Sequence, residues 1–147
     1  MALEEKQYAG DISPPQAWQM LEEIPQAVLV DVRTAPEWSF VGVPDLGILS
    51  KSAIFLEWQQ FPAMAVNADF SSSLVVHLEE QGHEADDPIL FICRSGARSR
   101  SATIALSQEG YGQCFNITGG FEGDADAHHH RSTVNGWKVA GLPWRQQ

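Results

Sequence analysis

The chain has 147 residues, the length of one ordinary domain, and its composition of 44% hydrophobic and 19% charged residues is typical of a globular protein. Its formal net charge of −10 argues against DNA or RNA as a partner, because nucleic-acid binding needs concentrated Lys and Arg to displace counterions. We therefore expect a single domain over residues 1–147, with a folded core over about residues 8–144 and no nucleic-acid partner.

The longest apolar runs, over residues 27–30 and 89–92, have the length of strands and fall well below the roughly 20 residues that a membrane helix needs. The N-terminus shows no basic region leading into an apolar segment, so no export signal is visible. We therefore expect no membrane partner and a cytoplasmic location. In that location Cys93 and Cys114 are expected to be reduced thiols rather than a disulfide.

Apolar runs of strand length alternate along the chain with helical patterns. In chain order the predicted elements are a possible edge strand over residues 8–12, a helix over 14–23, a strand over 28–32, a short helix over 35–40, a strand over 53–56, a helix over 70–81, a strand over 89–93, a helix over 98–109 and a strand over 114–117. Residues 57–69 are predicted to be an irregular connection, and the tail after Gly119 a wrapping loop. The alternation predicts an α/β fold with a central, mostly parallel sheet flanked by helices.

The most informative segment is the short polar loop that joins the strand over 89–93 to the helix that follows it. Cys93 stands at the carboxyl end of that strand, where α/β sheets bind ligands and where a helix presents free N–H groups. These groups favour a thiolate, and Gly96 permits a turn in which successive amides face an anion. A buried structural cysteine is the alternative, but Arg94 and Arg98 are poor neighbours for a core residue. The pattern therefore predicts Cys93 as a nucleophile.

Three segments of this chain resemble rhodanese domains. Residues 93–99, Cys-Arg-Ser-Gly-Ala-Arg-Ser, match the active-site loop of that family almost letter for letter. Residues 29–33, Leu-Val-Asp-Val-Arg, followed by Glu37-Trp38, are similar to its early Asp-Val-Arg…Glu segment, and residues 117–121, Ile-Thr-Gly-Gly-Phe, to its late strand and Gly-Gly turn. The resemblance covers about residues 8–144 and implies a rhodanese-like fold.

The resemblance implies a sulfurtransferase in which Cys93 takes a sulfane sulfur from a donor such as thiosulfate, holds it as a persulfide and passes it to cyanide or a thiol. It implies no cofactor and no metal. The expected partners are a small anionic sulfur donor and, as acceptor, a small thiol or a protein. The residues expected to cradle the sulfur and bind the donor are Arg94, Ser95, Gly96, Ala97, Arg98 and Ser99.

Two arginines of the loop are expected to differ in role. Arg94 would face the anionic end of the donor, whereas Arg98 would either do the same or turn back onto a carboxylate such as Asp31. Asp31, Arg33 and Glu37 are expected to form a supporting ion-pair cluster under the loop.

One segment departs from the family pattern. The family usually shows Gly-His-Ile-Pro-Gly-Ala where this chain has Gly-Val-Pro-Asp-Leu-Gly at residues 42–47, so the histidine is absent and the spacing is longer. Because the segment flanks the pocket in the family, the substrate preference stays open.

Two other function classes compete with sulfur transfer. Cysteine phosphatases and arsenate reductases of related fold place five residues between the cysteine and the arginine of their loop, whereas four separate Cys93 from Arg98. The tighter ring suits a single sulfur atom better. A non-catalytic rhodanese module that binds a partner is the second rival, but such modules typically lose the cysteine.

Two further features each have a structural and a functional interpretation. Cys114 could be a resolving thiol, but its apolar strand favours a packed core thiol. Three consecutive histidines, residues 128–130, cannot all converge on one metal ion, and we expect them in a solvated loop near the pocket with one histidine reaching it.

Overall fold

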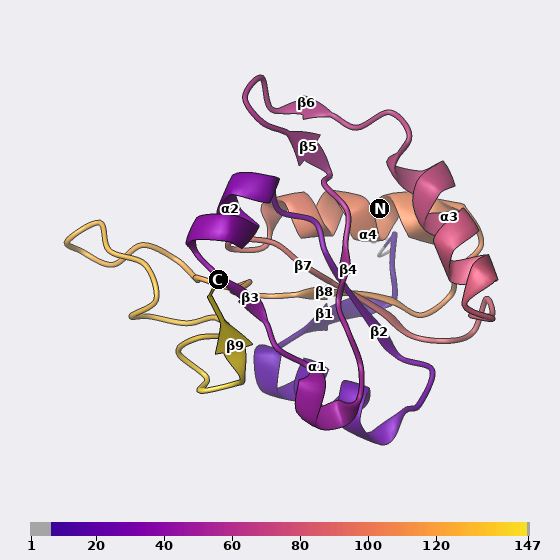
Figure 1. The fold of residues 1–147 in the computed structure, drawn as a ribbon, viewed down its shortest axis with the longest axis horizontal. Coiled ribbons are helices and arrows are strands. Elements are labelled where there is room, and N and C mark those ends of the chain that lie inside the picture. Colours follow the sequence, from indigo (N-terminus) through magenta and orange to yellow (C-terminus); the bar gives the residue numbers. More distant parts are fainter. Residues whose placement is uncertain (1–6, 147) are drawn as a thin grey trace, which may run out of the picture.

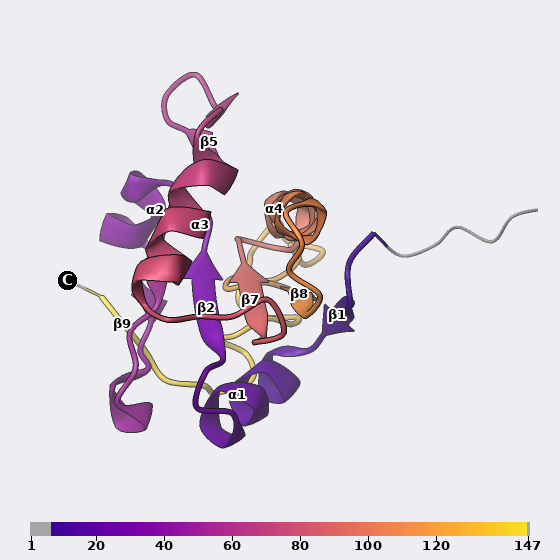
Figure 2. The same ribbon diagram turned by 90° about the vertical axis from the view of Figure 1, so that its right-hand side faces the viewer.

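The computed structural model describes residues 7–146 and places a parallel five-stranded sheet between helices (Figures 1 and 2). The strands stand in the spatial order β1 (Gly10–Ile12), β8 (Cys114–Ile117), β7 (Ile89–Ile92), β2 (Val28–Asp31) and β4 (Ile54–Phe55). All four neighbouring pairs are parallel, so the carboxyl ends of the strands meet at one edge of the sheet. The predicted fold class is confirmed.

Helices cover both faces of the sheet. Figure 2 shows α1 (Pro14–Glu23) on one face, and α3 (Phe70–Glu80) and α4 (Ala97–Gln108) on the other. Alternate residues of a strand point to opposite faces of the sheet. Leu90 and Ile92 pack in the hydrophobic cluster that includes residues of α1, whereas Ile89 and Phe91 pack in the cluster that includes residues of α3 and α4. Within residues 7–146, no helix is both long and apolar enough to cross a bilayer.

Local signals in the sequence account for the ends of these helices. At the start of α1, the Ser13 hydroxyl accepts a hydrogen bond from the Gln16 backbone N–H at 3.3 Å, and the Gln16 side chain accepts one from the Ser13 N–H at 2.8 Å. Gly96, with φ of +125°, directly precedes α4 and turns the chain from the loop into the helix.

Two segments contain short strands that the sequence did not predict. Between β4 and α3, β5 (Gln59–Gln60) and β6 (Ala65–Val66) pair as a small antiparallel hairpin, where we expected an irregular connection. Over its described residues, 120–146, the tail after Gly119 contains no helix, and its end forms β9 (Trp144–Arg145), which pairs antiparallel with β3 (Val43–Pro44). These strands have two residues each, too few for alternation to be recognised.

The remaining elements are short and lie between β2 and β4. They are the helix α2 (Ala35–Phe40) and the 3₁₀ turn η1 (Gly47–Leu49). Thr34 begins α2: its backbone N–H and its hydroxyl both donate to the Glu37 carboxylate, at 3.1 and 3.0 Å. The helix α2 is therefore the element that delivers Glu37 to the carboxyl edge of the sheet.

Candidate active site

The loop between β7 and α4 forms one side of a pocket at the carboxyl edge of the sheet. Because β7 is the middle strand of the order, this loop lies between the ends of β8 and β2. The pocket has a volume of about 330 Å³, and its lining residues are Glu37, Gln59, Met64, Cys93, Arg94, Ser95, Ala97 and Arg98. Open parallel sheets bind their ligands at this edge.

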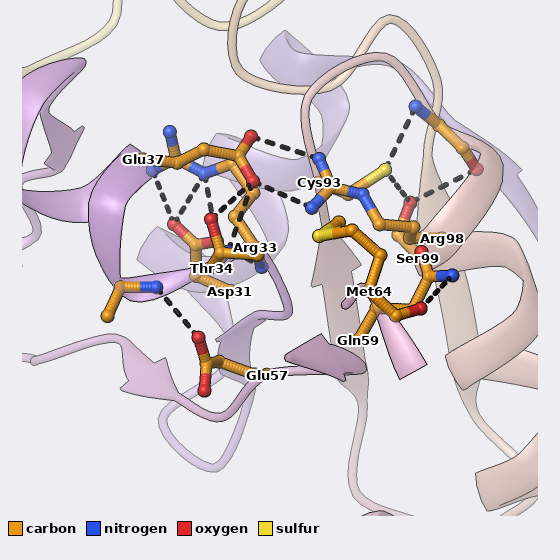
Figure 3. A network of polar contacts seen from close by, with 12 residues as sticks. Asp31, Arg33, Thr34, Glu37, Glu57, Gln59, Met64, Cys93, Arg98 and Ser99 are labelled. Atoms are coloured by element: carbon orange, nitrogen blue, oxygen red, sulfur yellow. Dashed lines mark hydrogen bonds and ion pairs between the residues drawn. The ribbon is translucent and has the colours of Figure 1, made fainter. Parts of the chain in front are cut away.

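Cys93 lies in the wall of the pocket and contacts its own loop. Its exposed fraction is 1%, and the Gly96 backbone N–H donates a hydrogen bond to Sγ at 3.1 Å. The Ser99 hydroxyl lies 3.2 Å from the same sulfur (Figure 3). Arg94 is exposed, Ser95 is half-buried, and both line the pocket. The loop thus brings one backbone N–H and one hydroxyl to the sulfur and places an exposed arginine at the pocket.

Arg98 turns back from the loop onto a carboxylate, which is Glu37 rather than the suggested Asp31. The pair is bidentate, with Nη1–Oε1 at 2.7 Å and Nη2–Oε2 at 3.0 Å, and both side chains are largely buried (Figure 3). Burial alone would raise the pKa of Glu37, but the Arg98 guanidinium and the two Thr34 donors outweigh it and hold that pKa at about 2.

Asp31 is unavailable to Arg98 because it already binds Arg33. The Arg33 Nη2 donates to Asp31 Oδ2 at 2.7 Å and to the Gly42 carbonyl at 2.8 Å, and both charged side chains are fully buried. The Arg33 guanidinium also lies 4.3 Å from the centre of the Phe121 ring. The expected cluster of supporting charges is therefore divided into two ion pairs, one under the loop and one beside it.

A segment of the tail holds the loop from the other side. The Phe121 N–H donates to the Cys93 carbonyl at 2.8 Å, and the Glu122 N–H donates to the Arg94 carbonyl at 3.0 Å. Gly120 permits this approach, since a Cβ placed there would lie 2.5 Å from the Cys93 carbonyl oxygen. The Gly119-Gly120 turn therefore lets the backbone of the tail pack directly against the backbone of the Cys93 loop.

Several residues of the site were not predicted from the sequence. Asn116 of β8 accepts a hydrogen bond from the Ser99 hydroxyl at 2.6 Å and donates one to Asp11 at 3.2 Å. An asparagine inside an apolar strand was a signal that could have been read, because a buried amide needs partners. Gln59 and Met64 reach the pocket from the unpredicted hairpin, and the sequence offered no signal for them.

The second cysteine is a core thiol, as predicted. Cys114 is fully buried, and burial raises the pKa of its thiol to about 11. Its register partner is Ile89, four residues before Cys93, so the two thiols are about 13 Å apart along the strand. That separation is too large for a disulfide.

The three histidines, residues 128–130, lie exposed in the tail. The expectation that one of them reaches the pocket was wrong, since no histidine belongs to its lining. Among residues 7–146, no group of three or more His, Cys, Asp or Glu side chains is placed to hold a metal ion.

Comparisons with known proteins agree with this fold. The family model described as the rhodanese-like domain matches residues 13–127. Rv0390 from M. tuberculosis, known as a crystal structure, aligns with a TM-score of 0.84 at 44% identity, covering 95% of this chain and 99% of that chain. An uncharacterized protein of Rickettsia conorii is 38% identical over 135 residues, which are 92% of this chain and 96% of its own length.

A relative with a named activity is more distant. The thiosulfate sulfurtransferase GlpE of Actinobacillus succinogenes is 29% identical over 133 residues, 90% of this chain and 87% of its own length. The fold and the family match define the class of α/β domains, here with a cysteine in the loop between a strand and a helix. Within that class, the chain belongs to the rhodanese-like domain family, whose members include sulfurtransferases.

Proposed function

We propose that this protein is a sulfurtransferase that carries a sulfane sulfur on Cys93. The observation that carries the proposal is the position of Cys93 Sγ, which lines the pocket and accepts a hydrogen bond from the Gly96 N–H at 3.1 Å. An N–H donor and a helix N-terminus favour an anionic sulfur over a neutral one. Both the thiolate and the terminal sulfur of a persulfide are such anions.

The reaction takes two balanced displacements. In the first, the Cys93 thiolate attacks the outer sulfur of thiosulfate, the S–S bond of thiosulfate breaks, and sulfite leaves with the electron pair. In the second, cyanide or a thiolate attacks the outer sulfur of the persulfide, which yields thiocyanate or a new persulfide and returns the Cys93 thiolate. No external oxidant or reductant is consumed in either step.

The two arginines at the pocket take different roles in this proposal. Both ends of the Arg98 guanidinium are bound to Glu37, so Arg98 fixes the loop. Arg94 is exposed at the pocket and binds the sulfonate end of the donor. The backbone amides of Ser95, Gly96, Ala97 and Ser99 supply the remaining donors for the sulfur anion, which is the task inferred for this loop.

The acceptor reaches the sulfur past the β5–β6 hairpin, because Gln59 and Met64 line the pocket. A small thiol, cyanide or a cysteine on a protein segment would all have to pass this hairpin. We retain the cytoplasm as the predicted location, where reduced thiols are available as acceptors.

The rival activities lead to different products. A phosphatase or arsenate reductase would bind a tetrahedral oxyanion in a wider loop, whereas four residues separate Cys93 from Arg98 here. A binding module without catalysis would have no use for the sulfur at the pocket wall. Hydrolysis of an aryl phosphate and reduction of arsenate are therefore the comparison assays.

The test is thiocyanate formation from thiosulfate and cyanide by the wild type, Cys93→Ala and Cys114→Ala. We expect turnover in the wild type, background rates in Cys93→Ala because the nucleophile is lost, and near wild-type rates in Cys114→Ala. The two variants make the same substitution, and each removes one buried thiol, so a general loss of stability would affect both. Activity in Cys93→Ala above background, or aryl phosphate hydrolysis comparable with sulfur transfer, would overturn the proposal.

A further inference from the structure

The Ser99 hydroxyl has more acceptors around it than it can serve. Its Oγ lies 2.6 Å from Asn116 Oδ1, 3.2 Å from Cys93 Sγ and 3.2 Å from the Gly96 carbonyl oxygen. A serine carries a single O–H proton and therefore donates one full hydrogen bond at a time. The shortest of the three contacts is with Asn116 and not with the sulfur. In the resting site the proton is therefore directed to Asn116.

The orientation of the Asn116 amide is fixed by Asp11. Asn116 and Asp11 are register partners on the neighbouring strands β8 and β1, and the Asn116 Nδ2 donates to Asp11 Oδ1 at 3.2 Å. The inverted amide would place its oxygen against the Asp11 carboxylate. Because Asn116 is 4% exposed, its Oδ1 also needs a protein donor, and Ser99 supplies it. The amide oxygen must face the serine.

This arrangement determines what Ser99 offers to the sulfur. With its proton on Asn116, the serine oxygen turns a lone pair toward Cys93 Sγ and can accept a bond from a neutral thiol. An anionic sulfur then has the Gly96 N–H as its donor and gains the Ser99 O–H only when the hydroxyl rotates away from Asn116. Asn116 and the sulfur anion thus compete for one proton.

We propose that Asn116, held by Asp11, is a positioning residue that limits the hydrogen bonding of Ser99 to the Cys93 sulfur and so keeps the sulfur anion reactive. A sulfur anion with fewer hydrogen bonds is formed less readily but is the stronger nucleophile once formed. The inference rests on the proposed role of Cys93 as nucleophile. It is tested by alkylation of Cys93, which needs no sulfur donor, so its failure is distinguishable from a failure of sulfur transfer.

The first variant is Asn116→Leu, which has a similar shape and no acceptor. The freed hydroxyl donates to the sulfur anion, so the midpoint of the pH dependence of iodoacetamide alkylation at Cys93 moves to lower pH by roughly half a unit to one unit. The alkylation rate at high pH falls about two- to threefold, because the stabilised thiolate is the weaker nucleophile. Peptide mass spectrometry distinguishes a label on Cys93 from a label on the buried Cys114 thiol.

The same change in a Ser99→Ala background tests whether Asn116 acts through the serine. We expect no shift of the midpoint between Ser99→Ala and the double variant, since the competing hydroxyl is gone. Ser101→Ala is the matched control, because Ser101 also lies on α4 and its hydroxyl contacts the Ala97 carbonyl at 3.4 Å. It should leave the midpoint unchanged.

A second variant, in which Asp11 and Asn116 exchange side chains, tests the same inference if Asn116→Leu does not fold. In Asp11→Asn combined with Asn116→Asp, the new amide at position 11 donates to the new carboxylate at position 116, which binds the Ser99 proton more strongly than an amide does. The midpoint should move to higher pH, and by more with Ser99 present than with Ser99→Ala.

Four charged groups that face the Cys93 loop are unchanged in every variant. They are Arg94 of the loop, Arg98 of α4, Glu37 of α2 and Asp31 of β2. The exchange, however, moves one carboxylate from position 11 to position 116, and the Ser99→Ala background measures the direct effect of that charge. A midpoint that is the same in folded Asn116→Leu and in the wild type would overturn the proposal. A shift of equal size with and without the Ser99 hydroxyl, for either substitution, would overturn it as well, because Asn116 would then act by another route.

Discussion

The two buried cysteines have different contacts, which underlie the different roles that we propose for them. Cys93 follows the end of β7, lines the pocket and accepts a hydrogen bond from a backbone N–H. Cys114 lies inside the core, where burial raises the pKa of its thiol to about 11 and its Sγ lies 3.5 Å from the Tyr111 carbonyl. A thiol bonded to a carbonyl is held in its neutral form. The chemistry is thus set by the contacts of each sulfur rather than by its identity.

The ion pair beside Cys93 predicts a specific pH dependence of stability. Glu37 has a pKa of about 2 in the folded chain and about 4.3 when unfolded, so its contacts with Arg98 and Thr34, net of burial, contribute roughly 3 kcal/mol above pH 4.3. That contribution is lost as the pH falls through the folded pKa. We expect Glu37→Gln to destabilise the chain by about 2 kcal/mol at pH 7 and by progressively less between pH 4.3 and 2. Urea unfolding across this range measures the difference.

Glu80→Gln is the matched control for this measurement, since Glu80 is exposed at the end of α3. It should change the unfolding free energy by less than about 0.5 kcal/mol at every pH. If the cost of Glu37→Gln were the same at pH 3 as at pH 7, the carboxylate charge would not be its cause.

At the scale of elements, the β7–α4 loop is held from two sides. The helix α2 binds it through Glu37 and Arg98, and the backbone N–H groups of residues 121–123 of the tail donate to the carbonyls of Cys93 and Arg94. Neither support belongs to the loop itself. The position of the sulfur therefore depends on segments far apart in the sequence that meet only in the folded chain.

Gly120→Ala tests the support from the tail. The added Cβ would lie 2.5 Å from the Cys93 carbonyl oxygen and 2.6 Å from the Arg94 carbonyl carbon, so the loop must move. We expect kcat/KM for thiocyanate formation to fall at least about tenfold, because small displacements of reacting groups are costly. Gly141→Ala is the control: Gly141 also has a positive φ, +75°, but a Cβ there meets no atom within 4 Å. Equal losses in the two variants would contradict the role of this contact.

The sequence predicted the parts of the fold and site that depend on neighbouring residues. The strand, loop and helix around Cys93 were found because an apolar run, Gly96 and a helical pattern lie next to one another. The pairing of Arg98 with Glu37 rather than Asp31 was not found, since it required knowing that Arg33 occupies Asp31. The hairpin of β5 and β6 was not predicted, because its strands have two residues each and lie largely at the surface.

At the scale of the whole molecule, the parallel sheet brings together site residues from most of the length of the chain. Asp11 of β1, Glu37 of α2, the β5–β6 hairpin, Cys93 and Asn116 of β8 all contribute at or near one edge. The net charge is −10, and the Arg98–Glu37 pair at the pocket is neutral, so we expect Arg94 to supply the local attraction for an anion that the general surface repels. This arrangement suits a small anionic donor better than a polyanion.

The central claim, a persulfide on Cys93, is tested most directly by intact-protein mass spectrometry after incubation with excess thiosulfate and removal of the small molecules. We predict that the chain gains the mass of one sulfur atom, that the added sulfur maps to the peptide carrying Cys93, and that cyanide removes it with release of an equal amount of thiocyanate. Cys93→Ala should show no gain. A wild-type chain that gains no sulfur, or that carries it on Cys114, would contradict the account.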